Sequence, residues 1–233
     1  MAQGKDADQL GGITKSFDQY EYVAIIIPGA TLLIGLLIAL PGWLPVTIDK
    51  DFSLGAFGMF LIAAYVAGQV LHAIGEVAER EFWRFWHGMP TDWVVENKPK
   101  LLDDGQWKNL PDAIKKLLGQ EITLEHYKSD RKGWRALVRQ IYVVVNAAGR
   151  TARIDAFNRT YGLMSGMTIA LLILAAVFGI EVWCGGALIS KATLGCAVAL
   201  VSAGFTLGRL YASGVSYGRE LFSEFLNEAA KRP

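Results

Sequence analysis

The chain has 233 residues, of which 52% are apolar, and it carries a formal net charge of +1 at pH 7. With charge so nearly balanced, bulk electrostatics indicate no partner, and no basic pattern with interleaved stacking aromatics predicts nucleic-acid binding. Soluble domains average about 45–50% apolar residues. The overall composition therefore does not separate a soluble from a membrane protein, and the distribution of charge along the chain has to decide.

Four long stretches of the chain contain no Asp, Glu, Lys or Arg. A bilayer core about 30 Å thick is crossed by roughly 20 apolar helical residues, so these stretches predict transmembrane helices at 22–41, 55–75, 161–181 and 190–210. A soluble helical bundle would show polar stripes along its helices, whereas the segment 166–180 is apolar all round. The predicted fold class is all-α, a polytopic membrane protein with four transmembrane helices and a helical cytoplasmic domain.

Positive charge predicts the orientation of these spans. Of the 23 Lys and Arg residues, the two short loops 42–54 and 182–191 hold one each. The others lie in or next to the N-terminal segment 1–21, the insert 76–160 and the tail 211–233. By the positive-inside rule, both termini and the insert face the cytoplasm. The expected location is the bacterial inner membrane, where the lipid bilayer is the first partner.

The second span ends in the sequence AYVAGQVLHAIGEVAE, in which polar side chains recur at helical spacing. Gln69, His72 and Glu76 share one helix face, which Arg80 extends. Polar groups inside a bilayer are costly and usually face protein or a water-filled cavity. Two interpretations are open: a pore wall near the cytoplasmic side, or an interhelical hydrogen bond by Gln69 with the other side chains among the lipid headgroups. The depth of Gln69 favours an inward-facing role for it, and the headgroup interpretation fits His72 and Glu76 slightly better.

Small residues mark where the predicted spans approach other helices. Ala64 and Gly68 lie four residues apart in the second span, and Gly204 and Gly208 do so in the fourth. Within lipid, helices associate where small side chains let their backbones come close. We expect helix packing at these residues, either within one subunit or between subunits of a homo-oligomer. In the first span, Pro28 predicts a kink.

The insert is predicted to be helical, with its helix ends set by Gly, Pro and capping residues. The second span continues as a helix into the insert, and residues 91–110 are expected to form an irregular connection. A further helix begins with Pro111 at its first position and ends at Gly119. Either Ser129 or Asp130 caps the next helix.

A basic stripe lies at the start of that last helix. It is formed by Lys128, Arg131, Lys132, Arg135 and Arg139. Such a stripe can bind anionic lipid headgroups, a nucleotide or an acidic protein. The simpler interpretation is a solvated face that pairs partly with Glu125 and Asp130.

The third and fourth spans are predicted to extend beyond the membrane without a break. No Pro occurs between Pro111 and Pro233, so the chain from about residue 150 can run into the third span as one helix, and the fourth span can continue into the tail. An apolar face along the tail is formed by Leu210, Tyr217, Leu221, Phe222, Phe225 and Leu226. We expect the cytoplasmic extensions of the second, third and fourth spans to bundle. Two buried free thiols at Cys184 and Cys196 are favoured over a disulfide.

The sequence carries no pattern typical of catalysis. The three His residues lie in different segments, and no HExxH, GxSxG or Walker motif occurs. Enzymes that bind a metal in the membrane need several His or carboxylate ligands to converge. We therefore expect a protein that is not an enzyme, with no catalytic residue, no metal and no cofactor.

Three segments carry a resemblance: YVAIIIPG at 22–29, AYVAGQVLHAIGEVAE at 64–79 and RIDAFNRTYGL at 153–163. Together they resemble bacterial four-span membrane proteins, some of which are encoded in anti-phage defence loci as membrane effectors. The resemblance implies an inner-membrane protein that oligomerises and damages the membrane when triggered. It implies no catalytic residues.

The predicted function is therefore an effector that permeabilises or depolarises the membrane in response to a cytoplasmic protein or nucleotide signal. A constitutive channel or small transporter, and a scaffolding subunit of a membrane complex, are the alternatives.

Overall fold

The structure, a computed structural model, describes residues 22–40, 54–185 and 189–231. Every element in these ranges is a helix, and no strand occurs among them, which confirms the all-α class. The predicted cytoplasmic segment 1–21 and nearly all of the predicted loop 42–54 lie outside the described residues.

Three helices are long and apolar enough to cross a membrane: α3 (Leu54–Phe85), α7 (Ala152–Trp183) and α8 (Ile189–Lys231). The structure thus supports three membrane-length helices, and α7 and α8 continue beyond the predicted spans as expected. The first predicted span is a shorter apolar helix, in which the π-helical turn η1 (Tyr22–Ile26) leads into α2 (Ile27–Ala39).

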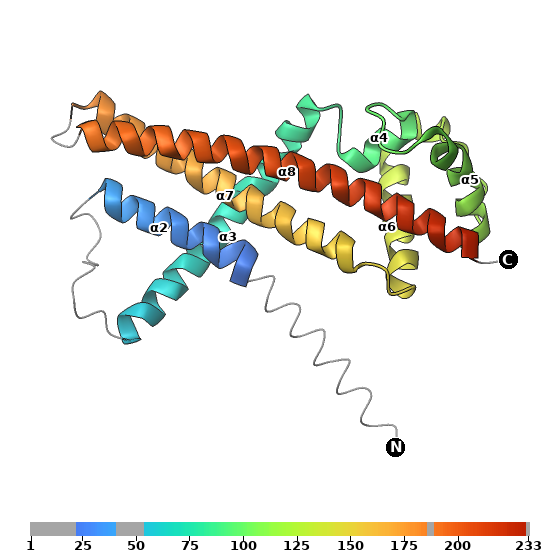
Figure 1. The fold of residues 1–233 in the computed structure, drawn as a ribbon, viewed down its shortest axis with the longest axis horizontal. Coiled ribbons are helices and arrows are strands. Elements are labelled where there is room, and N and C mark those ends of the chain that lie inside the picture. The colour runs from blue at the N-terminus through green and yellow to red at the C-terminus, as the bar shows by residue number, and fades with distance from the viewer. Residues whose placement is uncertain (1–21, 41–53, 186–188, 232–233) are drawn as a thin grey trace, which may run out of the picture. The chain divides into compact units, whose positions relative to one another are not determined.

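The chain divides into two compact units, and each of the three long helices contributes to both. The borders follow Glu79 in α3, Tyr161 in α7 and Leu210 in α8. The first unit contains α2 and the apolar parts of the long helices. The second contains the remaining parts, together with the short helices of the insert. Figure 1 shows the elements in chain order from blue to red.

In the first unit, α2 packs closely against α3 at glycines. A Cβ atom on Gly29 would overlap the backbone oxygen of Ala64, and one on Gly68 would overlap the backbone oxygen of Ile25. Backbone therefore meets backbone at this crossing, the close approach that small residues permit in membrane helices. A Cβ on Gly35 would overlap the side chain of Leu174, which places α7 against α2.

Helices α7 and α8 run side by side within the first unit (Figure 1). The hydroxyl of Thr168 donates a hydrogen bond to the hydroxyl of Thr206 at 2.8 Å, and the thiol of Cys196 lies 3.4 Å from the carbonyl oxygen of Ala175. Both cysteines are free, as predicted, but Cys184 is exposed rather than buried. It follows the last residue of α7, where the apolar packing has ended.

The second unit has a hydrophobic core built from distant parts of the chain. Around it lie α4 (Pro90–Glu96), α5 (Asp104–Leu118), the 3₁₀ turn η2 (His126–Lys128) and α6 (Arg131–Ala147). The core includes the fully buried tail residues Leu221, Phe222 and Phe225, together with Trp134 and Ile154. The predicted apolar face of the tail is therefore confirmed, and it packs with the start of α7, where Ile154 lies.

Two helix starts in the insert differ from the prediction. Residues 91–110 are mostly helical, because α4 begins at Pro90 and α5 begins at Asp104. Asp103 caps α5 by accepting a hydrogen bond from the backbone N–H of Gln106, whose side chain bonds back to the backbone of Asp103. Pro111 therefore lies inside α5 rather than at its first position, since this capping box fixes an earlier start. The predicted helix end at Gly119 is confirmed as a left-handed C-cap, and of the two candidate N-caps, Ser129 and Asp130, it is Asp130 that caps α6.

A hydrogen bond between α6 and α7 gives the second unit a dependence on pH. The hydroxyl of Tyr142 donates to Asp155 Oδ1 at 2.9 Å, and burial together with this bond raises the pKa of Tyr142 from 10.0 to about 12. The folded state thus holds the phenol proton more tightly than the unfolded state. The resulting stabilisation is complete below pH 10 and is lost as the pH rises towards about 12.

We expect Tyr142→Phe to flatten this decline in stability at alkaline pH, because phenylalanine has no proton to lose. The free energy of unfolding, measured by denaturant titration between pH 8 and 12, would show the difference. An equally steep decline in the variant would contradict the assignment to Tyr142.

Candidate functional site

The membrane-length part of α3 has three different faces. Successive residues of an α-helix are rotated by about 100°, so four buried residues fall on one narrow side: Ala64, Gly68, Leu71 and Gly75. This side packs within the chain, since Ala64 and Gly68 lie at the contact with α2. A Cβ atom on Gly75 would lie 2.9 Å from the hydroxyl oxygen of Ser165 in α7.

The predicted polar stripe is centred roughly a third of a turn away from the packed side of α3. Gln69 is exposed and donates a hydrogen bond to the hydroxyl of Tyr65 at 2.9 Å. His72 Nε2 lies 3.8 Å from Glu76 Oε1, and the two side chains are 39% and 64% exposed. Each of these three polar groups therefore has a polar neighbour on its own helix, and among the described residues Gln69 and Glu76 are left exposed while His72 is partly buried. Arg80 continues the stripe and is exposed as well.

The third face of α3 is apolar and exposed. It is formed by Met59, Ile62, Val66, Val70 and Val77, each more than half exposed. This is the surface that a lipid-facing helix requires. The polar stripe lies between this apolar face and the packed face, at the edge of the surface available to lipid.

The two glycines predicted to pack in α8 face open space among the described residues. A Cβ atom added to Gly204 or Gly208 would meet no described atom within 4 Å, whereas Ala199 and Ala203 lie on the buried side of α8. Phe205, 75% exposed, lies beside the glycines. Contact within the subunit is therefore present at Ala64 and Gly68, and the described residues make no such contact at the open side of Gly204 and Gly208.

The basic stripe of α6 is not one free surface. Arg131 donates to the backbone oxygen of Asp92 at 3.1 Å and to the carboxylate of Glu96 at 2.9 Å. Arg135 pairs with the carboxylate of Asp92 at 3.1 Å. The sequence did not indicate Asp92 and Glu96 as partners, because both lie in the segment predicted to be irregular and are distant in sequence.

The remaining members of the stripe lie at the surface. Lys128 pairs with Glu125 at 2.8 Å, as predicted. Lys132 and Arg139 are exposed and pair with no carboxylate in the part of the chain that the structure describes. Asp130, expected to neutralise the stripe, instead caps α6 by accepting a hydrogen bond from the backbone N–H of Gly133.

No cluster of three or more His, Cys, Asp or Glu residues that could hold a metal ion occurs among the described residues. In the part of the chain that the structure describes, the fold and these surfaces define a class: a helical protein with three membrane-length apolar helices, one of which bears a largely exposed polar stripe. No family model, curated protein or solved structure matches the chain. The resemblance to bacterial four-span proteins therefore stays a prediction.

Proposed function

We propose that this chain is a four-span inner-membrane protein that assembles into homo-oligomers and opens a hydrated path through the bilayer in response to a cytoplasmic signal. The observation that carries the proposal is the three-faced helix α3. One face packs within the chain and another suits lipid, so the polar stripe between them requires a third environment. Water, or a second copy of the chain with water between, supplies it.

The hydrogen bonds of the stripe leave part of its polar capacity unused. A Gln side chain has two N–H donors and an accepting oxygen, and Gln69 uses one donor, on Tyr65. The hydroxyl proton of Tyr65 and the carbonyl oxygen of Gln69 form no further hydrogen bond among the described residues. In hydrocarbon each unmade bond costs on the order of 2 kcal/mol or more, and a hydrated interior removes this cost.

The open face of α8 supports the assembly. Gly204 and Gly208 present backbone that no described side chain covers, and such a surface permits close approach by another helix. In the setting implied by the sequence resemblance, the assembled protein acts as an anti-phage effector that depolarises the membrane of an infected cell. The second unit, which carries the basic stripe, then receives the signal.

We expect Gln69→Leu to reduce ion leak from liposomes that contain the protein, because it removes the deepest polar group of the proposed path. Val70→Leu is the matched control, since Val70 lies on the exposed apolar face of the same helix. Leak should be compared at equal amounts of reconstituted protein, after the particle size in detergent has been determined. If wild-type oligomers show no ion leak, the scaffolding alternative is favoured. If Gln69→Leu and Val70→Leu leak equally, the polar stripe does not line the conducting path.

A further inference from the structure

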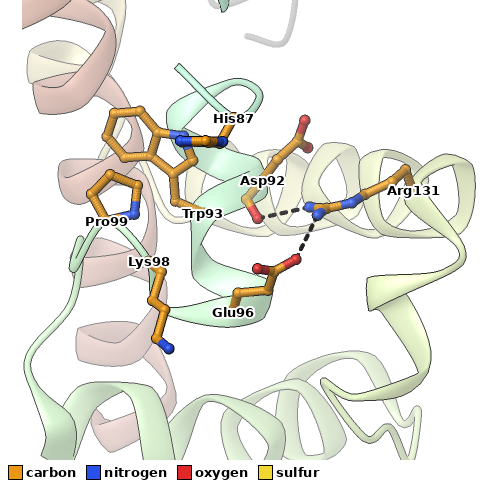
Figure 2. A pocket seen from close by; sticks show the side chains of 7 residues that line it. All are labelled: His87, Asp92, Trp93, Glu96, Lys98, Pro99 and Arg131. Carbon is orange, nitrogen blue, oxygen red and sulfur yellow. Dashed lines mark hydrogen bonds and ion pairs between the residues drawn. The ribbon is translucent and has the colours of Figure 1, made fainter. Parts of the chain in front are cut away.

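A cavity of about 620 Å³ lies in the second unit, beside α4 and α6. Figure 2 shows the side chains around it, among them His87, Asp92, Glu96, Lys98 and Arg131. The volume falls in the range of about 300–1,000 Å³ that is usual for small-molecule sites. Four of these side chains carry charge: Asp92, Glu96, Lys98 and Arg131.

Hydrogen bonds hold the cavity wall in place. The indole N–H of Trp93 donates to the backbone oxygens of Trp86 and Gly88, at 3.0 and 2.9 Å. The indole N–H of Trp134 donates to the backbone oxygen of Thr91 at 2.8 Å. Both ends of the segment that leads from α3 into α4 are thus fixed by buried tryptophans, and the polar side chains project from a rigid frame.

The two ion pairs beside the cavity differ in how readily they can open. Asp92 is 4% exposed, and its Oδ1 atom is buried without a hydrogen bond, so Arg135 cannot leave without stranding a buried charge. Glu96 is 45% exposed, and water can solvate its carboxylate when Arg131 turns to another anion. Only the pair of Arg131 with Glu96 is therefore exchangeable.

The cavity also has a cationic group to spare. Each of its carboxylates has an arginine, whereas the side chain of Lys98 makes no hydrogen bond or ion pair within the described residues. When Glu96 turns into solvent, the guanidinium of Arg131 and the ammonium of Lys98 both become available to one ligand. Guanidinium groups bind phosphate oxygens through two parallel hydrogen bonds, and lysine adds a point charge.

We propose that this cavity binds the phosphate group of a small molecule between Lys98 and Arg131, and that Glu96 acts as an internal competitor that occupies Arg131 in the empty state. A phosphate of a soluble metabolite and a phosphate of a lipid headgroup share this chemistry. The inference goes beyond the proposed pore and does not depend on it, because binding at the cavity can be measured where no current flows.

The proposal is tested by calorimetric titration of the full chain, in phosphatidylcholine nanodiscs, with pyrophosphate. Two substitutions should change the affinity for pyrophosphate in opposite directions. Glu96→Gln removes the competitor and should tighten binding about tenfold, and Lys98→Gln removes one charged hydrogen bond and should weaken it about tenfold. Glu125→Gln and Lys100→Gln are matched controls, since both residues are exposed, pair elsewhere and do not line the cavity. A gain in affinity cannot arise from misfolding, so Glu96→Gln keeps the test decisive.

The source of the phosphate is decided by adding phosphatidylglycerol to the nanodiscs. Loss of pyrophosphate binding in their presence, with the order of the variants unchanged, identifies a lipid headgroup, and undiminished binding identifies a soluble ligand. Absence of pyrophosphate binding in plain nanodiscs overturns the proposal. The proposal is also overturned if Glu96→Gln does not raise the affinity for pyrophosphate. It is overturned as well if Lys98→Gln and Lys100→Gln lower this affinity equally.

Discussion

Gly68→Leu is expected to destabilise the first unit markedly. Gly68 faces the backbone oxygen of Ile25, and even a Cβ atom would overlap it. Backbone atoms cannot relieve an overlap by changing rotamer, as a side chain can. The helices α2 and α3 would therefore have to separate along the contact that also includes Gly29 and Ala64. Overpacking usually costs about 1–3 kcal/mol. We expect a cost at or above the upper end, because the leucine side chain would overlap backbone atoms of Ile25.

Gly58→Leu is the matched control for this change, since Gly58 lies in the same helix and an added Cβ meets nothing within 4 Å. Leucine is also the better helix former, by somewhat under 1 kcal/mol, so this control should be neutral or stabilising. The temperature at which half of the protein remains monodisperse in detergent should fall by several degrees for Gly68→Leu and hold for Gly58→Leu. Equal midpoints would show that the two helices do not meet at Gly68.

Gly204→Leu separates contact within the chain from contact between chains. A Cβ atom at this position also meets none of the described residues within 4 Å, so the monomer should keep its thermal midpoint. If copies meet at this face of α8, the variant should lose the larger particles while it remains folded.

Helix type and extent were largely readable from the sequence, because local signals determine them. Charge-free stretches marked the apolar helices, and the three- and four-residue spacing of Leu221 and Phe225 marked the buried face of the tail. Gly119 and Asp130 marked helix ends through their own backbone and side-chain geometry. The helix start predicted at Pro111 was wrong, because the position of a Pro at the start of a helix is only a preference. The capping box at Asp103 fixes an earlier start.

The contacts between distant elements could not be predicted from the sequence, because they depend on which helices pack together. Gly68 and Gly204 look alike in sequence, yet one is packed against backbone and the other is open. Arg131 bonds to Glu96, 35 residues earlier in the chain, and no periodicity reports a pair at that separation. The polar stripe of α3 was visible from spacing alone, but its position between a packed and an apolar face required the packing partners of α3.

The second large effect is expected at Trp134, which lies at the centre of the core of the second unit. Its side chain is fully buried, and its ring stacks on Phe222 of α8 with centroids 6.0 Å apart and an interplanar angle of 11°. Its indole N–H donates to the backbone oxygen of Thr91. One residue of α6 thus contacts both α8 and the segment that forms α4.

We expect Trp134→Ala to lower the free energy of unfolding by about 3–5 kcal/mol, the usual cost of removing a large buried aromatic side chain. Because domains are stable by only about 5–15 kcal/mol, the second unit should become sensitive to trypsin at its many Lys and Arg residues. Trp183→Ala is the control, since that side chain is 91% exposed and should leave digestion unchanged. Similar digestion of the two variants would contradict the central position of Trp134.

Trp134→Phe divides this cost between ring packing and the hydrogen bond. Phenylalanine keeps an aromatic ring against Phe222 but cannot donate to the backbone oxygen of Thr91, which is then left without its indole donor. Loss of one buried hydrogen bond costs about 1–3 kcal/mol, so the stability of this variant should lie between those of the wild type and Trp134→Ala. Since Thr91 is in α4, next to Asp92, the same variant should also loosen the wall of the phosphate cavity and weaken pyrophosphate binding while the core of the second unit stays folded. If Trp134→Phe is as unstable as Trp134→Ala, the stability that Trp134 provides comes from its hydrogen bond to Thr91 and not from the packing of its ring on Phe222.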